Sequence, residues 1–135
     1  TAALTQFAEK HANVHFIKSL GRINYLNTLK ESYLLMGNSS SGLIESAFFG
    51  IPTINIGDRQ LGRERGENVI DVMQEEGAIF MILSRLMNDE EYLNGFRSRV
   101  HPFGDGNSAQ KTLQILLSTN YSDPSLLNKQ LVLAH

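Results

Sequence analysis

Apolar residues along the chain follow two patterns: short continuous runs, and stripes whose members lie three or four residues apart. The short runs predict strands at residues 14–17, 33–36, 53–56 and 69–72. The stripes predict helices that end near residue 13, cover 23–29, run from about 42 to 49, and cover 79–86 and 113–117. Strands that alternate with helices in this way predict an α/β fold built on a parallel sheet.

Three polar segments directly follow predicted strands and should therefore share one edge of that sheet. They are residues 18–22, 37–42 and 57–66. Ligands of parallel sheets bind beyond the carboxyl ends of the strands, so this edge is the expected binding edge.

Composition narrows the classes of protein that fit. The hydrophobic fraction of 41% can form a core, and 135 residues suit one domain over residues 1–135, with a tail from about residue 120. The net charge of −2 argues against a nucleic-acid partner, because phosphate-backbone binding needs a basic face. The chain has no cysteine, which excludes disulfides and thiolate metal sites.

The ends of the chain suggest a cytoplasmic fragment. No apolar run approaches the roughly 20 residues of a membrane helix, and residues 1–10 lack the pattern of a signal peptide. The chain has no initiator methionine and opens inside a predicted helix. The tail carries an apolar face that could support a homo-oligomer, formed by Leu126, Leu127, Leu131 and Val132.

The strongest local signal is the serine turn, residues 37–42, between a predicted strand and a predicted helix. Its two glycines let the backbone approach a ligand, and Ser39, Ser40 and Ser41 add three hydroxyls. A helix start offers unpaired N–H groups and a partial positive charge, which together bind phosphate. A flexible linker or a plain helix cap fits the same composition, but the position between two short apolar elements favours a binding turn.

Glu45 falls about one turn into the helix predicted after the serine turn. An isolated glutamate there most often complements the helix dipole. Beside a phosphate site a carboxylate repels the phosphates, so its useful target is a neutral diol such as a ribose.

The second signal lies in residues 57–68, which contain three arginines and three glycines; residues 57–66 of this segment are called the arginine loop here. Guanidinium groups match phosphate geometry, so the loop suits an anion clamp. Arg59 is the best candidate because it is nearest to the end of the preceding strand. The nearly balanced charges also allow the arginines to pair with neighbouring acids instead.

Catalytic groups are not evident outside these two loops. The histidines at positions 11, 15, 101 and 135 lack a metal-binding spacing, and no Ser-His-Asp or Cys-His arrangement can be proposed. We therefore expect no metal and no cofactor, and the sequence assigns no catalytic residue.

Residues 37–71 resemble the carboxy-terminal domain of UDP-N-acetylglucosamine 2-epimerases, most of all the hydrolysing branch, which includes sialic-acid pathway enzymes. The resemblance rests on Gly-Asn-Ser-Ser, Glu, Gly-x-Pro, Gly-x-Arg-Gln-x-Gly-Arg and Gly-Glu-Asn in this order, and it covers most of residues 11–117. It implies a Rossmann-like three-layer fold, the carboxy-terminal half of a glycosyltransferase-B-like arrangement with UDP in the cleft.

The resemblance also implies a role for each segment of the binding edge. Arg59 would contact the phosphates and Glu45 would accept the ribose hydroxyls. The diphosphate would be held by Ser39, Ser40 and the backbone of Ser41 and Gly42. The uracil would lie near the turn formed by Leu20, Gly21 and Arg22.

The reaction of that family removes the sugar C2 proton, expels UDP by elimination, and adds water to give N-acetylmannosamine. The resemblance implies that the acid–base groups of this reaction lie mainly in an amino-terminal domain and the early part of the second domain, and we expect both to be outside this sequence. The parent protein is therefore expected to be an enzyme, and this chain alone a half that binds UDP or a UDP-sugar.

Two alternatives remain open. A nucleotide-sugar glycosyltransferase half shares the fold and also places an acid on the ribose, although the arginine loop speaks against it. A stand-alone, non-enzymatic binding or assembly protein derived from the same fold is the other.

Overall fold

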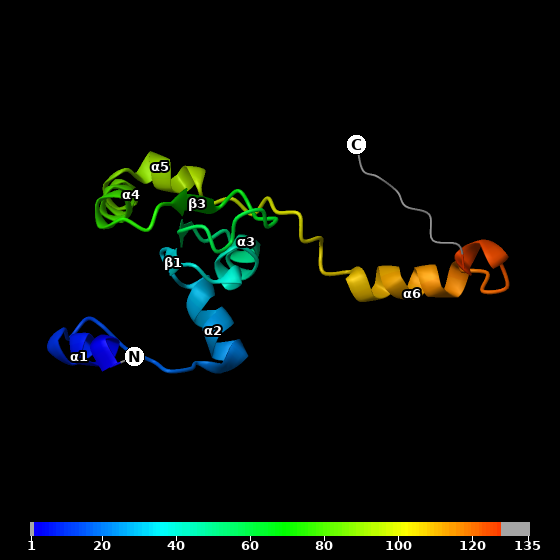
Figure 1. The fold of residues 1–135 in the computed structure, drawn as a ribbon, viewed down its shortest axis with the longest axis horizontal. Coiled ribbons are helices and arrows are strands. Elements are labelled where there is room, and N and C mark those ends of the chain that lie inside the picture. The colour runs from blue at the N-terminus through cyan, green and yellow to red at the C-terminus, as the bar shows by residue number, and fades with distance from the viewer. Residues whose placement is uncertain (1, 128–135) are drawn as a thin grey trace. The chain divides into compact units, whose positions relative to one another are not determined.

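The structure of the protein is a computed structural model that describes residues 2–127 (Figure 1). Its residues fall into two compact units, 1–102 and 103–135. Two residues of the expected apolar tail face, Leu131 and Val132, lie outside the described residues. Within the described part, no helix has the length and hydropathy to cross a membrane.

The first unit is built on a three-stranded sheet, which confirms the predicted parallel arrangement. The strands are β1 (Leu35–Gly37), β2 (Thr53–Ile56) and β3 (Val69–Val72), in the order β1-β2-β3. Both neighbouring pairs are parallel, and the register places Gly37 opposite Asn55 and Asn55 opposite Asp71. The carboxyl ends of the three strands therefore meet at one level.

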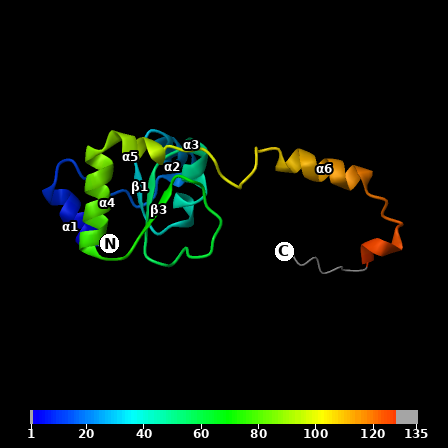
Figure 2. The same ribbon diagram turned by 90° about the horizontal axis from the view of Figure 1, so that it is seen from above.

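Helices cover both faces of this sheet, so the first unit has the three layers of a Rossmann-like fold. Figure 2 shows α4 (Glu76–Asn88) and α5 (Glu90–Gly95) on one side of the strands, and α2 (Gly21–Lys30) and α3 (Glu45–Phe49) on the other. Alternate residues of a strand point to opposite faces, and β2 follows this rule. Thr53 hydrogen-bonds to Ser46 of α3, whereas Ile54 packs into the core beneath α4.

The core lies between the sheet and α4 with α5. Ile54, Ile70, Leu86 and Leu93 are buried together there. Burying one such side chain contributes about 1.5–3 kcal/mol, and this contribution fixes the strands against the helices. The short helix α5 was not predicted, because six residues are too few to show a stripe. Asp89 begins it by accepting a hydrogen bond from the Tyr92 amide at 2.9 Å.

One predicted strand and two predicted element boundaries were wrong. Residues 14–17 form no strand: their side chains are largely exposed, and no described strand pairs with them. A strand needs a hydrogen-bonding neighbour, which a local apolar pattern cannot supply. The first strand begins at Leu35 rather than residue 33, and the helix expected from residue 42 begins at Glu45 after a single 3-10 turn, η1 (Ser40–Gly42). Gly50 ends α3 as expected, in the left-handed conformation with φ of 65°.

The remaining elements match the predicted helices. Helix α1 (Ala2–Lys10) begins the first unit, and α2, α4 and α6 (Ser108–Ser118) cover the predicted stripes. In the second unit α6 has no buried residue, and η2 (Pro124–Leu127) follows it.

Candidate functional site

Two of the three segments predicted for the binding edge lie there; residues 18–22 follow no strand, because residues 14–17 do not form one. The serine turn follows β1, and the arginine loop follows β2, both at the carboxyl edge of the sheet. The register sets Gly37, Asn55 and Asp71 side by side just below these loops. The two strongest sequence signals are therefore brought together, as parallel sheets require.

The serine turn satisfies most of its own backbone groups. Ser39 caps η1: its hydroxyl accepts from the Ser41 amide at 3.4 Å, and its carbonyl accepts from the Gly42 amide at 3.0 Å. The amides of Leu43 and Ile44 both donate to the Ser40 carbonyl at 3.0 Å. A phosphate that used the Gly42 amide would have to compete with this local bond.

The serine hydroxyls differ in what they can offer a ligand. Ser41 is hydrogen-bonded through its hydroxyl to the phenol of Tyr25 on α2. Ser39 is exposed and Ser40 is half-buried. Ser39 and Ser40 are therefore the better-placed donors, and Ser41 acts as a link to α2.

A buried network supports the serine turn from below; its members are Ser46, Thr53 and Asn68. The Ser46 hydroxyl donates to the Gly42 carbonyl at 2.7 Å, and Thr53 donates to Ser46 at 2.9 Å. The Asn68 amide donates to Ser46 at 2.8 Å and to the Ile51 carbonyl at 2.7 Å. All three members are at most 1% exposed. The network fixes the end of the turn to the sheet and to the residue before β3.

Gly42 has a steric reason to be glycine. A Cβ on Gly42 would lie 3.0 Å from the Thr53 Cγ2. The close approach lets the buried network reach the Gly42 carbonyl.

Glu45 is the first residue of α3, not one turn into a helix as expected. It is half-buried, and α3 has only five residues. A carboxylate at this position lies close in sequence to the serine turn and can still accept hydroxyl donors from a ligand.

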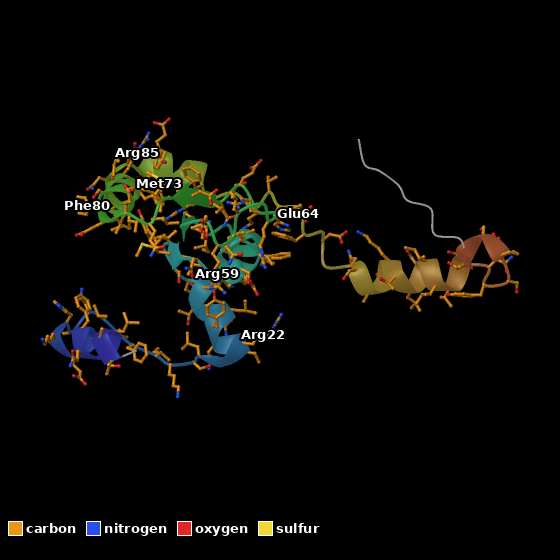
Figure 3. All side chains as sticks on the ribbon, viewed as in Figure 1. Arg22, Arg59, Glu64, Met73, Phe80 and Arg85 are labelled. Atoms are coloured by element: carbon orange, nitrogen blue, oxygen red, sulfur yellow. The ribbon has the colours of Figure 1, made fainter. Side chains whose placement is uncertain are left out.

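The arginine loop divides its three arginines between two roles. Arg59 and Arg63 are exposed; Figure 3 labels Arg59. Arg65 instead forms a salt bridge with Asp71 of β3 and donates to the Gln60 carbonyl at 2.9 Å. The pairing alternative therefore holds for Arg65, while Arg59 retains an exposed guanidinium.

Sequence reasoning missed two residues of this site, Gln60 and Asn68. Gln60 is 3% exposed, and its amide donates to the Asn38 carbonyl at 2.8 Å, which ties the arginine loop to the serine turn. Both residues belong to the motifs that carried the family resemblance, Arg-Gln-x-Gly-Arg and Gly-Glu-Asn. Their place in those motifs was the available signal.

A hollow of about 460 Å³ lies at the turn before α2, lined by residues 17–22 and Tyr25. Leu20 is half-buried, whereas Gly21 and Arg22 are exposed, and Gly21 has φ of 68°. Because Tyr25 also bonds to Ser41, α2 joins this turn to the serine turn.

A second hollow of about 480 Å³ lies at the carboxyl ends of β2 and β3. Its lining includes two carboxylates, Asp58 and Asp71, with Leu61 and Met73 as apolar neighbours. Carboxylates repel phosphate and accept hydroxyl groups, so this hollow suits an uncharged, hydroxyl-bearing group rather than an anion. Among the described residues, no three His, Asp or Glu side chains gather into a metal-binding group.

Comparisons with known proteins found a matching family and several relatives. The family model described as UDP-N-acetylglucosamine 2-epimerase matches residues 1–117. A UDP-N,N'-diacetylbacillosamine 2-epimerase (hydrolyzing) of Legionella pneumophila is 38% identical over 121 residues, which are 88% of this chain and 30% of that protein. The polysialic acid biosynthesis protein P7 of Escherichia coli is 38% identical over 107 residues, 79% of this chain and 27% of that protein.

A solved structure supports the fold. The crystal structure of a UDP-N-acetylglucosamine 2-epimerase superposes with a TM-score of 0.70 at 23% identity, over 86% of this chain and 32% of that one. The predicted Rossmann-like half of a glycosyltransferase-B-like fold is thereby confirmed. The chain spans about a third or less of the length of these relatives.

Proposed function

Because the chain belongs to the UDP-N-acetylglucosamine 2-epimerase family, we propose that it is the UDP-binding part of a hydrolysing 2-epimerase. The observation that carries this proposal is the serine turn, fixed by a buried network at the carboxyl edge of a parallel sheet. The name of the Legionella pneumophila relative includes the word hydrolyzing, which supports the choice of branch. The family assignment favours an epimerase over the glycosyltransferase alternative.

In the proposed complex the diphosphate lies on the serine turn. The hydroxyls of Ser39 and Ser40 donate to it, and Arg59 neutralises its charge. The amides of Ser41 and Gly42 add support where they exchange their local bonds to Ser39 for the phosphate. A guanidinium suits this role because its planar fork can donate two parallel hydrogen bonds to phosphate oxygens.

The proposed position of the nucleoside follows from the same placement. Glu45 accepts the ribose hydroxyls, and the turn at Leu20, Gly21 and Arg22 holds the uracil. The contact between Tyr25 and Ser41 supports this arrangement, since it joins the two proposed subsites through α2. The substrate of the parent protein is a UDP-sugar of the N-acetylglucosamine type. The name of the Escherichia coli relative suggests a pathway that supplies sialic-acid sugars.

Catalysis in the parent removes the sugar C2 proton and expels UDP. The serine turn and Arg59 stabilise the leaving UDP, because donors that face developing negative charge lower the barrier. The isolated chain binds UDP without turnover: leaving-group stabilisation alone does not break the C2–H bond, and proton transfer needs an acid–base group within hydrogen-bond reach.

Titration of the chain with UDP, followed by NMR, tests the binding site. We expect micromolar to millimolar affinity, roughly −8 to −4 kcal/mol, with shifts at residues 39–45. Arg59→Lys should weaken UDP more than uridine, since lysine keeps the charge and loses the fork. Shifts that avoid residues 39–45, or equal weakening of both ligands, would contradict the assignment.

A coupled assay for UDP and N-acetylmannosamine tests the claim of no turnover. Release of UDP from UDP-N-acetylglucosamine by the purified chain should stay at the background rate. Turnover that disappears in Glu45→Gln or Glu67→Gln would show that this chain holds its own catalytic groups.

A further inference from the structure

A chain of side-chain hydrogen bonds crosses the carboxyl edge of all three strands. Its members, called the edge network here, are Asn38, Asn55, Gln60, Arg65 and Asp71. The Asn55 amide donates to Asp71 at 2.7 Å, and Arg65 pairs with the same carboxylate. Arg65 also donates to the Gln60 carbonyl at 2.9 Å, and the Gln60 amide reaches the Asn38 carbonyl at 2.8 Å.

This network fixes the backbone on both sides of Arg59. The Leu61 amide donates to the Asp58 carbonyl at 2.8 Å, which closes a turn with Arg59 and Gln60 as its two central residues. Glycines with positive φ lie on both sides of that turn, Gly57 at 77° and Gly62 at 75°. The Gln60 side chain points inward to the serine turn and is buried, whereas Arg59 is exposed.

From this geometry we infer that Gln60 is a positioning residue, which holds the turn that carries Arg59 against the serine turn. The inference rests on the proposed function, because it concerns the diphosphate that Arg59 contacts. Gln60 itself touches no ligand: its amide spans from the arginine loop to the backbone of Asn38, one residue before Ser39. The backbone of Arg59 is thereby held near the serine turn by one hydrogen bond and one turn.

The chemistry of the bond explains the choice of side chain. A carbonyl acceptor requires a donor, and a glutamine amide donates without adding charge beside a phosphate site. Glutamate would place a carboxylate oxygen against the Asn38 carbonyl, and methionine would keep the shape without any donor.

A double-mutant cycle on the full chain tests this inference. Gln60→Met should lower the affinity for UDP roughly 3- to 10-fold, the usual effect of one neutral hydrogen bond, and should change the affinity for uridine less than about twofold. In an Arg59→Ala background the same substitution should cause no further loss, because the residue acts through Arg59. Gln110→Met, at an exposed position of α6, is the matched control and should leave both affinities unchanged.

Results that contradict the positioning role differ from those that contradict UDP binding. If Gln60→Met costs as much UDP affinity in the Arg59→Ala background as in the unsubstituted chain, or as much for uridine as for UDP, the positioning role is overturned while UDP binding stands. Failure of the unsubstituted chain to bind UDP at residues 39–45 would instead overturn the proposed function, and the inference with it. If Gln60→Met does not fold by circular dichroism, Gln60→Leu removes the donor without adding a charge and serves in its place.

Discussion

The two loops at the carboxyl edge of the sheet are held in different ways. The serine turn rests on a fully buried network of neutral side chains, Ser46, Thr53 and Asn68. Apart from the buried Gln60, the arginine loop is held by partly exposed groups, among them the salt bridge from Arg65 to Asp71, whose side chains are 23% and 60% exposed. The serine turn is thus anchored in the core, whereas the arginine loop is attached mainly through contacts near the surface.

The difference separates stability from ligand binding. A buried polar group that loses its partner costs about 1–3 kcal/mol, whereas an exposed ion pair contributes about 0–1 kcal/mol. Substitutions beneath the serine turn should therefore lower the stability of the whole first unit. Substitutions at the exposed positions of the arginine loop should leave stability nearly unchanged and act on the ligand.

Gly66→Ala should have the largest effect, because Gly66 ends the arginine loop against the buried support of the serine turn. An added Cβ would lie 2.5 Å from the Asn68 Oδ1, 2.8 Å from the Ala47 Cβ and 3.3 Å from the Val100 carbonyl. We expect a loss of about 2–3 kcal/mol in the free energy of unfolding, measured by urea denaturation. Gly77→Ala is the control: its Cβ would meet nothing within 4 Å, so stability should stay the same or rise. Equal stabilities of the two variants would refute the close packing of Gly66.

Ser46→Ala should have the next largest effect. It removes the donor to the Gly42 carbonyl and the acceptor shared by Thr53 and Asn68. The expected loss is about 1–2 kcal/mol by the same denaturation measurement, since Asn68 keeps its bond to the Ile51 carbonyl and the single Thr53 hydroxyl proton can turn to the same carbonyl. Ser84→Ala, at a half-buried position of α4, should change stability by less than about 0.5 kcal/mol. A loss for Ser46→Ala as small as that of the control would mean that the network does not support the turn.

The sequence was informative wherever a signal is local. The stripes of α2, α4 and α6 and the runs of β2 and β3 lie within single segments, and these elements were predicted. The serine turn and the arginine loop were found because small and charged residues gather there, and a parallel sheet then requires them to share an edge.

The sequence was uninformative wherever a contact joins distant positions. Asn38 and Gln60 are 22 residues apart, as are Ser46 and Asn68, and no periodicity links either pair. The pairing of Arg65 with Asp71, rather than with a ligand, depends on the register of β3 beside β2. Residues 14–17 show the opposite error, a strand that was predicted and does not form. An apolar run forms a strand only when a neighbouring strand pairs with it.

Asp71→Asn tests the exposed side of the comparison. The substitution keeps an oxygen for Asn55 and Arg65 and removes the charge, so stability should fall by less than about 1 kcal/mol. The difference from the unsubstituted chain should shrink further at high salt, because exposed charges are screened. Glu64→Gln removes the same charge from an exposed position of the loop, labelled in Figure 3, and should change stability even less. A loss above about 2 kcal/mol for Asp71→Asn would show that the edge network contributes as much to stability as the buried network does.

The turn at Asp105, in the second unit, extends the comparison to a loop held only by exposed contacts, and it carries the smallest expected effect. The Asn107 amide donates to the Asp105 carboxylate at 3.1 Å and Lys111 pairs with it at 3.1 Å, and these contacts lower the pKa of Asp105 below 3.8. A lowered pKa in the folded state means that the carboxylate favours folding above the unfolded value, and that this contribution disappears as the pH falls through the folded pKa. The turn before α6 should therefore loosen at a lower pH than an unpaired aspartate would give, seen as shifts of the Asn107 amide in an NMR titration. Lys111→Met should raise the pKa of Asp105 only partway to 3.8, because the larger cause is the Asn107 amide.

Asp123 is an internal control: the Ser125 amide lowers its pKa, so Lys111→Met should leave it unchanged. A full return of the Asp105 pKa to 3.8 in that variant would show that the ion pair, rather than the backbone, holds this turn.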